Sequence, residues 1–162
     1  MTEPAPATDT AEELGAVQTQ VTVAAAPEKA FRVFTEGFDR WWPRSHHIGE
    51  GELAEAVIEP IEGGRWYERT TNGEECDWGT VLVWDPPRTV ALSWANDGEF
   101  RSDPNHASRI DVTFTRDGAG TIVMVEHSEF AGHRAAAELR AAVMDTGGWP
   151  TLLVAFVEAA TA

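Results

Sequence analysis

The 162-residue sequence contains one cysteine, Cys76, one tyrosine, and only 12 basic residues against 27 acidic residues. A single cysteine cannot form an internal disulfide, so we expect a reducing compartment, the cytoplasm. The formal net charge of −15 argues against nucleic-acid binding, which depends on phosphate neutralisation, and against anionic membrane surfaces. The sequence contains no run of about 18 apolar residues, so we predict no transmembrane helix. The N-terminus shows no signal-peptide pattern.

Motifs for metal binding and nucleophilic catalysis are also missing. His46 and His47 are adjacent, so on an extended segment they point in opposite directions, and no Cys or His follows at a chelating spacing. Cys76 has acidic neighbours on both sides, which disfavours a thiolate. The sequence has no G-x-S-x-G motif, and Gly63-Gly64 precedes a strand instead of opening a helix. We therefore predict no metal and no cofactor, and we assign no catalytic residue.

The pattern along the chain predicts one α+β domain after a short tail. Residues 1–16 carry four acidic and no basic residues, which is typical of a disordered tail. Residues 17–23 alternate as a strand does, a helix is expected from Pro27 to Gly37, and FDRWW is expected to form a second short helix before Pro43. Six further strands with turn residues between them indicate an antiparallel meander, in the segments 53–60, 65–71, 76–85, 89–95, 108–117 and 121–130.

One face of this sheet is expected to be strongly apolar. Three strands carry alternating apolar residues: Trp78, Leu82 and Trp84; Val90, Leu92 and Trp94; and Ile110, Val112 and Phe114. An apolar sheet face needs a cover. Residues 132–160 are rich in alanine, and Trp149, Leu152, Leu153, Phe156 and Val157 recur at helical spacing. We expect a long C-terminal helix to supply the cover.

Several local motifs resemble those of the START-like, or helix-grip, superfamily, in the branch of homologues of the activator of heat-shock-protein ATPase. The motifs are APEKAF at residues 26–31, WWP at 41–43, GGRWYE at 63–68, PPR at 86–88, EHSEF at 126–130 and GGWPTLL at 147–153. Within that branch, FTEGFDRWWP, GGRWYE, DPN at 103–105 and GGWPTLL together resemble the calicheamicin self-resistance subgroup. The resemblance spans about residues 17–160, and residues 17–162 are expected to form a single START-like domain.

The resemblance implies a curved sheet of six to seven strands around a long C-terminal helix, with two short helices after the first strand and a ligand cavity between sheet and helix. Aromatic walls with few polar groups suit a flat apolar ligand. His127 follows the same alternation as Val123 and Val125, so it is a candidate for the cavity. The candidate ligand-binding residues are Trp41, Trp42, Trp66, Trp84, Trp94, Gly98, Phe100, His127, Trp149 and Phe156.

Two details of this set stay open at the level of sequence. Two adjacent tryptophans on a short helix are not expected to both point inward, so one of Trp41 and Trp42 is expected in the core and the other at the cavity rim. Gly98 lies in the long connection 95–108. In the resembled subgroup the protein is attacked by bound enediyne in place of DNA, so Gly98 has two interpretations: a radical-sensitive backbone site or a plain turn glycine.

Three functions are consistent with these features. The first is a binding protein for a hydrophobic, polyketide- or enediyne-type small molecule, with antibiotic sequestration or self-resistance as a special case. The second is an enzyme of the same fold, a cyclase or hydrolase that uses a buried carboxylate or His127. The third is a cochaperone-like ATPase activator, which ranks last. Nothing in the sequence decides between a monomer and a homodimer.

Overall fold

The computed structural model describes residues 16–43, 51–95, 107–129 and 148–161. The predicted tail, apart from its last residue, lies outside this part, as do Gly98 and Phe100. The described elements are, in order, β1 (Val17–Val23), α2 (Pro27–Thr35), α3 (Phe38–Trp41), β2 (Leu53–Ile58), β3 (Arg65–Thr70), β4 (Glu75–Asp85), β5 (Thr89–Trp94), β6 (Ser108–Asp117), β7 (Gly120–Ser128) and α5 (Trp149–Thr161).

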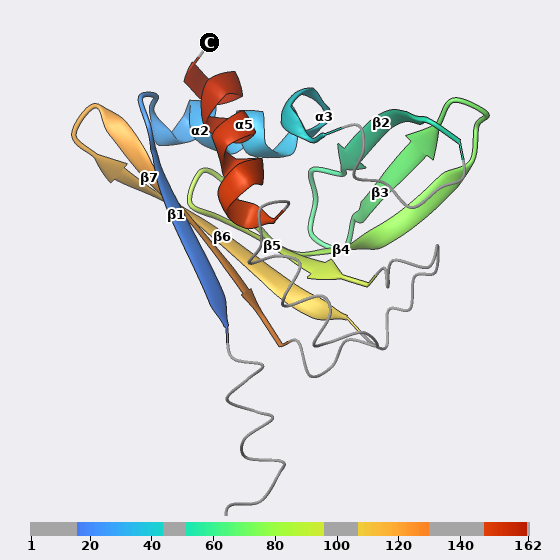
Figure 1. Cartoon of the computed structure of the whole chain (residues 1–162). Coiled ribbons are helices and arrows are strands. Elements are labelled where there is room, and N and C mark those ends of the chain that lie inside the picture. The colour runs from blue at the N-terminus through green and yellow to red at the C-terminus, as the bar shows by residue number, and fades with distance from the viewer. Residues whose placement is uncertain (1–15, 44–50, 96–106, 130–147, 162) are drawn as a thin grey trace, which may run out of the picture.

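The strands form one seven-stranded sheet in the order β1-β7-β6-β5-β4-β3-β2. Each neighbouring pair is antiparallel. The sheet curls, and α2, α3 and α5 all lie on its concave side (Figure 1). This arrangement confirms the predicted α+β helix-grip fold, including the two short helices after the first strand.

The helices bury the apolar faces that their sequences predict. Pro27 occupies the first turn of α2, where a missing N–H has no cost, and Ala30, Phe31 and Phe34 face the core. Helix α5 buries Trp149, Leu152, Leu153, Phe156 and Ala160 over its 13 residues. The rest of the predicted helix over 132–160 lies outside the described residues. Within the described ranges, no helix is long and apolar enough to cross a membrane.

Strand β4 bends between the two halves of the sheet, and Gly79 makes the bend possible. A Cβ at Gly79 would lie 1.8 Å from the carbonyl oxygen of Ser93 on β5. The backbone N–H of Ala95 donates to the carbonyl oxygen of Trp78 at 2.6 Å, and that of Thr80 donates to Ser93 Oγ at 2.8 Å. The two backbones therefore approach at a distance that excludes any side chain at this position.

The prediction that Leu82 lies on the inner face of β4 is wrong. The register of β4 shifts at Trp78, in the pairing with β3, and again between Val81 and Val83, so that Val81 lies opposite Leu92 and Trp84 opposite Val90. Val81 is therefore buried on the inner face, while Leu82 is only half-buried. An extra residue in a strand inverts the alternation that follows it, and simple period-two reasoning does not detect such a bulge.

Candidate functional site

Trp41 and Trp42 both point inward, which corrects the expectation that one would lie at a rim. Each is 4% exposed. Trp41 packs between Phe34 and Phe156, with ring centroids 5.1 and 5.5 Å away, and its Nε1 donates to the carbonyl oxygen of Val33. Trp42 instead stacks on Phe38 at 4.8 Å. The backbone is helical at Trp41 and extended at Trp42 (ψ 129°), so both side chains enter the interior, where their rings meet edge-to-face at 5.8 Å and both pack on Phe38.

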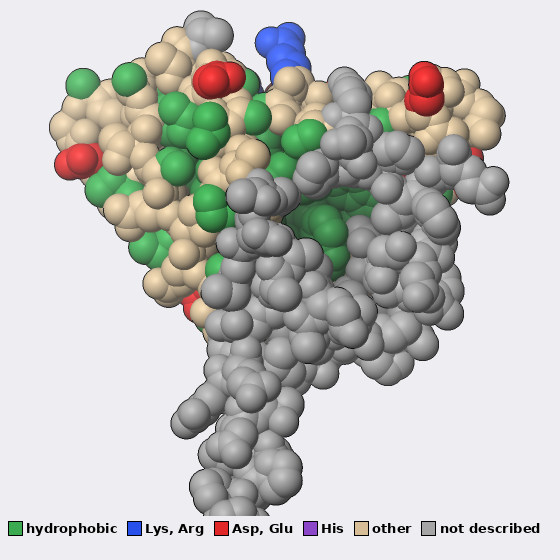
Figure 2. Space-filling model, in the orientation of Figure 1, with side chains coloured by type: hydrophobic (Ala, Val, Ile, Leu, Met, Phe, Trp, Pro, Cys, Tyr) green, Lys and Arg blue, Asp and Glu red, His purple; other side chains and the backbone are tan. Residues whose placement is uncertain are grey.

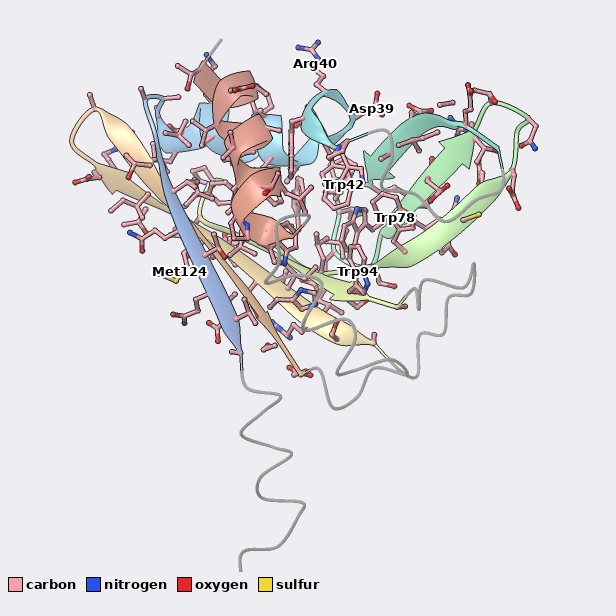
Figure 3. The ribbon with its side chains drawn as sticks, viewed as in Figure 1. Asp39, Arg40, Trp42, Trp78, Trp94 and Met124 are labelled. Atoms are coloured by element: carbon pink, nitrogen blue, oxygen red, sulfur yellow. The ribbon has the colours of Figure 1, made fainter. Side chains whose placement is uncertain are left out.

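Trp42 belongs to a group of five tryptophans, here called the indole cluster. Its ring centroid lies 5.4 Å from that of Trp78 and 6.4 Å from that of Trp149. Trp66 lies 5.4 Å from Trp78 and 5.2 Å from Trp94, in both cases near edge-to-face. Figure 3 shows Trp42, Trp78 and Trp94 side by side between the helices and the curled sheet. The cluster thus joins the residue that follows α3 with residues of β3, β4, β5 and α5: Trp42, Trp66, Trp78, Trp94 and Trp149.

A chain of buried hydrogen bonds borders the cluster at His127. Trp149 Nε1 lies 3.1 Å from His127 Nδ1, and Ser108 Oγ lies 2.8 Å from His127 Nε2. An indole N–H can only donate, so Nδ1 accepts. Nε2 of a neutral ring then carries the proton and donates to Ser108, whose hydroxyl can donate onward to the carbonyl oxygen of Trp94 at 3.5 Å. The contacts fix both the ring position and its tautomer.

Burial of His127 confirms that it follows the alternation of Val123 and Val125 onto the inner face, since all three are 0% exposed. Its ring centroid lies 6.3 Å from that of Trp94 and 6.2 Å from that of Trp149. The histidine predicted from sequence is therefore in contact with the indole cluster.

A carboxylate is buried in the same region. Glu68, on β3, is 0% exposed, and its Oε1 accepts a 2.7 Å hydrogen bond from Trp78 Nε1. Burying a carboxyl group in an aromatic setting is costly unless it is hydrogen-bonded. A core that served stability alone would be better filled by an apolar side chain, so Glu68 marks this end of the interior as specialised.

Two indole N–H groups of the cluster have no hydrogen-bond partner. They belong to Trp66 and Trp94, and both nitrogen atoms are buried. A buried donor without an acceptor costs about 1–3 kcal/mol. Native structures contain few such groups, and each calls for an explanation such as strain, catalysis or an unfilled binding role.

Figure 2 shows hydrophobic side chains near the middle of the face. Trp94 is only partly buried. Among the described residues, no group of three or more His, Cys, Asp or Glu side chains could hold a metal ion.

Two of the other predicted site residues lie away from the indole cluster. Trp84 packs edge-on against Phe31 of α2 at 5.1 Å and lines a separate open groove of about 470 Å³ beside α2 and the Pro86-Pro87 turn. Phe156 packs on Phe34 and Trp41. The structure thus brings Trp42, Trp66, Trp94, Trp149 and His127 together and separates Trp84 from them.

Three residues of the site were not among the predicted ligand-binding residues: Trp78, Ser108 and Glu68. The first was assigned to the apolar sheet face, where it does lie. Ser108 pairs directly with Trp94 across β5 and β6, and Glu68 lies two residues after Trp66 on the same strand. Alternation from the neighbouring tryptophans is the signal that could have selected both.

Cys76 confirms the expectation of an unreactive thiol. Burial, followed by the negative charges of Glu68, Glu74 and Asp77, raises the pKa of its thiol from 9.0 to about 11. A thiol with so high a pKa is almost wholly protonated at neutral pH. Cys76 is therefore a poor nucleophile.

Alkylation kinetics check this directly. At pH 8, iodoacetamide should modify Cys76 in the folded protein at least about tenfold more slowly than in the same chain unfolded in urea, because two units of pKa reduce the thiolate about a hundredfold. Mass spectrometry over time measures both rates. Equal rates would show that the thiol is neither buried nor electrostatically suppressed.

The outer face of β2, β3 and β4 is polar. Arg65 lies 2.7 Å from Asp77 and 3.1 Å from Glu75, and Arg69 bonds Glu55 and Glu75. Hydrogen bonds from Arg69 and Arg65 lower the pKa of Glu75. These pairs are exposed, so they contribute little to stability.

Comparison with solved structures finds close relatives. The anthrahydroquino-gamma-pyrone synthase Txn09, solved in complex with SUM, is 37% identical, with a TM-score of 0.65 and coverage of 90% of this chain and 96% of that chain. The self-sacrificing resistance protein CalC from Micromonospora echinospora is 36% identical, with a TM-score of 0.69 and coverage of 91% and 95%.

A more distant structure shares the fold alone. The Aha1 dimer from Colwellia psychrerythraea is 18% identical, with a TM-score of 0.62 and coverage of 89% and 94%. No curated protein matches the sequence. The family model described as "Activator of Hsp90 ATPase homolog 1-like protein" matches residues 24–160. Together with the fold and the two close relatives, this match shows that the chain belongs to the activator of Hsp90 ATPase homologue 1-like family.

Proposed function

We propose that the protein binds a flat, ring-containing hydrophobic small molecule at the indole cluster. The observation that carries the proposal is the convergence of five tryptophans with three buried polar groups, at His127, Ser108 and Glu68. Ligand sites are typically aromatic-walled concavities with a few placed polar groups. A core that is only structural has no use for those polar groups.

The chemistry of the cluster favours an aromatic ligand. Indole rings in edge-to-face contacts present both ring faces and ring edges, and a flat ligand can pack against either. Desolvation of apolar area supplies most of the binding free energy, about 25 cal/mol per Å². The polar groups fix orientation. The chain's net charge of −15 disfavours an anionic ligand.

The close relatives support a small-molecule role without deciding its kind. One is named a synthase and was solved with a bound molecule, and the other is named a self-sacrificing resistance protein. The two relatives are about equally similar to this chain, and their names describe two different activities on one fold. For this chain we propose binding of a polyketide- or enediyne-type natural product, with sequestration or self-resistance as its use.

Catalysis is the second candidate, favoured by the hydrogen-bond chain at His127. The neutral ring is held by Trp149 on one side and Ser108 on the other. A histidine with a fixed tautomer beside an aromatic site is suited to proton transfer on a bound carbonyl compound. A cyclase-type reaction would use such a group. Cochaperone activity stays the lowest-ranked of the three hypotheses.

Thermal unfolding with neutral tricyclic probes tests the binding proposal. At a concentration a hundred times its Kd, 9-fluorenone should stabilise the fold by about 2.7 kcal/mol, which raises Tm by roughly 5–10 °C for a domain of this size. Tryptophan fluorescence should be quenched in parallel. Absence of both effects across fluorenone, anthraquinone and hydroxylated anthraquinones would contradict the proposal.

Mass balance with activated calicheamicin and a panel of linear polyketides then separates the uses. Unchanged bound ligand indicates sequestration. One chain cleavage per ligand indicates self-sacrifice, and peptide mapping would show whether Gly98 is the cleaved position. More than one ligand converted per protein, lost in His127→Phe while binding persists, indicates an enzyme.

A further inference from the structure

We infer that the N–H groups of Trp66 and Trp94 form a subsite for a neutral carbonyl-type oxygen of the ligand, a ketone, quinone or pyrone oxygen. The inference rests on the proposed function and specifies which ligands the indole cluster selects. It begins from the two buried indole nitrogens that have no partner, on rings whose centroids lie 5.2 Å apart.

The other indoles show that the fold can satisfy such donors. Trp41 donates to a backbone carbonyl, Trp78 to Glu68, and Trp149 to His127. Trp66 and Trp94 are neighbours, and the N–H of each lacks an acceptor. In this they differ from Trp41, Trp78 and Trp149. Trp66 is 0% exposed, so bulk water does not take the place of the acceptor.

The donors define the complementary group. An indole N–H only donates, so the partner must be an acceptor. The ring neighbours of Trp66 are aromatic, namely Phe38, Trp78 and Trp94, and offer no strong acceptor. A flat ligand that packs among these rings and carries an oxygen on its ring system would supply one.

The nearby carboxyl group of Glu68 favours a neutral oxygen over a carboxylate. Glu68 lies two residues from Trp66 on the inner face of β3, and it bonds Trp78, the ring next to Trp66. An anionic ligand placed against Trp66 would approach this buried carboxyl group. A ketone or quinone oxygen accepts both N–H bonds without that repulsion.

A matched pair of probes measures the subsite. 9-Fluorenone and fluorene are neutral, flat tricyclic molecules that differ in one carbonyl group. Replacing Trp66 or Trp94 by 3-benzothienylalanine keeps the ring shape and removes the N–H. In the full-length chain, each replacement should weaken the binding of fluorenone about three- to tenfold, which is the effect of one hydrogen bond. The Kd of fluorene should stay unchanged.

A matched control uses the same replacement at Trp78, whose N–H has a partner. Without ligand, the Trp78 replacement should lower Tm, because it leaves Glu68 without that donor. The replacements at Trp66 and Trp94 should leave Tm unchanged or raise it, because they delete an unsatisfied donor.

The outcomes separate the two proposals. Equal losses for fluorenone and fluorene, or no loss for either, would overturn the subsite while ring binding stands. A fall in Tm at Trp66 and Trp94 that matches the fall at Trp78 would also overturn it. Failure of the unmodified protein to bind either probe would overturn the proposed function itself.

Discussion

Replacing Gly79 with alanine is expected to lower the free energy of unfolding by more than about 4 kcal/mol, enough to leave much of the protein unfolded at 37 °C. The added Cβ would lie 1.8 Å from the carbonyl oxygen of Ser93 and 2.7 Å from its carbonyl carbon. Both are backbone atoms, so no side-chain rotation relieves the overlap. The strands must separate, which breaks the contacts between Trp78, Thr80, Ser93 and Ala95 at the bend of β4.

Chemical denaturation measured by circular dichroism checks this expectation, and Gly118→Ala is the matched control. Gly118 has a φ of +62° and no atom within 4 Å of an added Cβ, so its replacement brings backbone strain alone, about 1–2 kcal/mol. A Gly79→Ala variant as stable as Gly118→Ala would show that β4 and β5 do not approach as closely as described.

Replacing Trp42 with alanine is expected to remove ligand response as well as stability. The side chain is 4% exposed and contacts Phe38, Trp78 and Trp149. Truncating a buried tryptophan costs about 3–5 kcal/mol. The lost ring forms one wall of the indole cluster. The apparent affinity for 9-fluorenone, measured by fluorescence quenching and by thermal stabilisation, should therefore fall at least about tenfold.

Trp41→Ala is the matched variant, because it lies next in the sequence and is equally buried. It should lose comparable stability, yet keep its fluorenone affinity within about threefold at 15 °C, where circular dichroism verifies folding. Its ring packs between Phe34 and Phe156 and meets the indole cluster at Trp42. Equal loss of affinity in both variants would show that Trp41 supports the ligand site as much as Trp42 does. Trp→Phe versions repeat the comparison if either alanine variant fails to fold.

Much of the fold is predictable from alternation, turn residues and helix signals. The strand segments from residue 53 onward match β2 to β7 closely, because glycine and proline turns separate them. What escaped prediction are the register shifts in β4. They arise from tertiary contacts between β3, β4 and β5, and local periodicity carries no record of them.

The candidate site was predictable in part. His127 and four of the cluster tryptophans follow from composition, alternation and the family resemblance. The outcome at Trp41 and Trp42 was not, because the helix ends between the two residues and the change of backbone conformation lets both side chains enter the interior. The unpartnered N–H groups of Trp66 and Trp94 also lie beyond sequence reasoning, since hydrogen-bond partners come from strands far apart in the chain.

Most solved relatives with low identity establish the fold alone, and the family carries unlike activities on one scaffold. The indole cluster is the feature of this chain on which a specific hypothesis about its ligand rests. Two of its buried indole N–H groups, those of Trp66 and Trp94, lack an acceptor, which reduces stability, and we propose that a ligand oxygen supplies one.

The central claim is that the indole cluster, and no other tryptophan, receives the ligand. The chain's seven tryptophans each give one indole signal in a ¹H–¹⁵N correlation spectrum, assigned by Trp→Phe variants. On titration with 9-fluorenone, the signals of Trp42, Trp66, Trp78, Trp94 and Trp149 should shift, those of Trp66 and Trp94 downfield, while the signal of Trp84 stays in place. Shifts confined to Trp84, or no shift at saturating probe, would contradict the account.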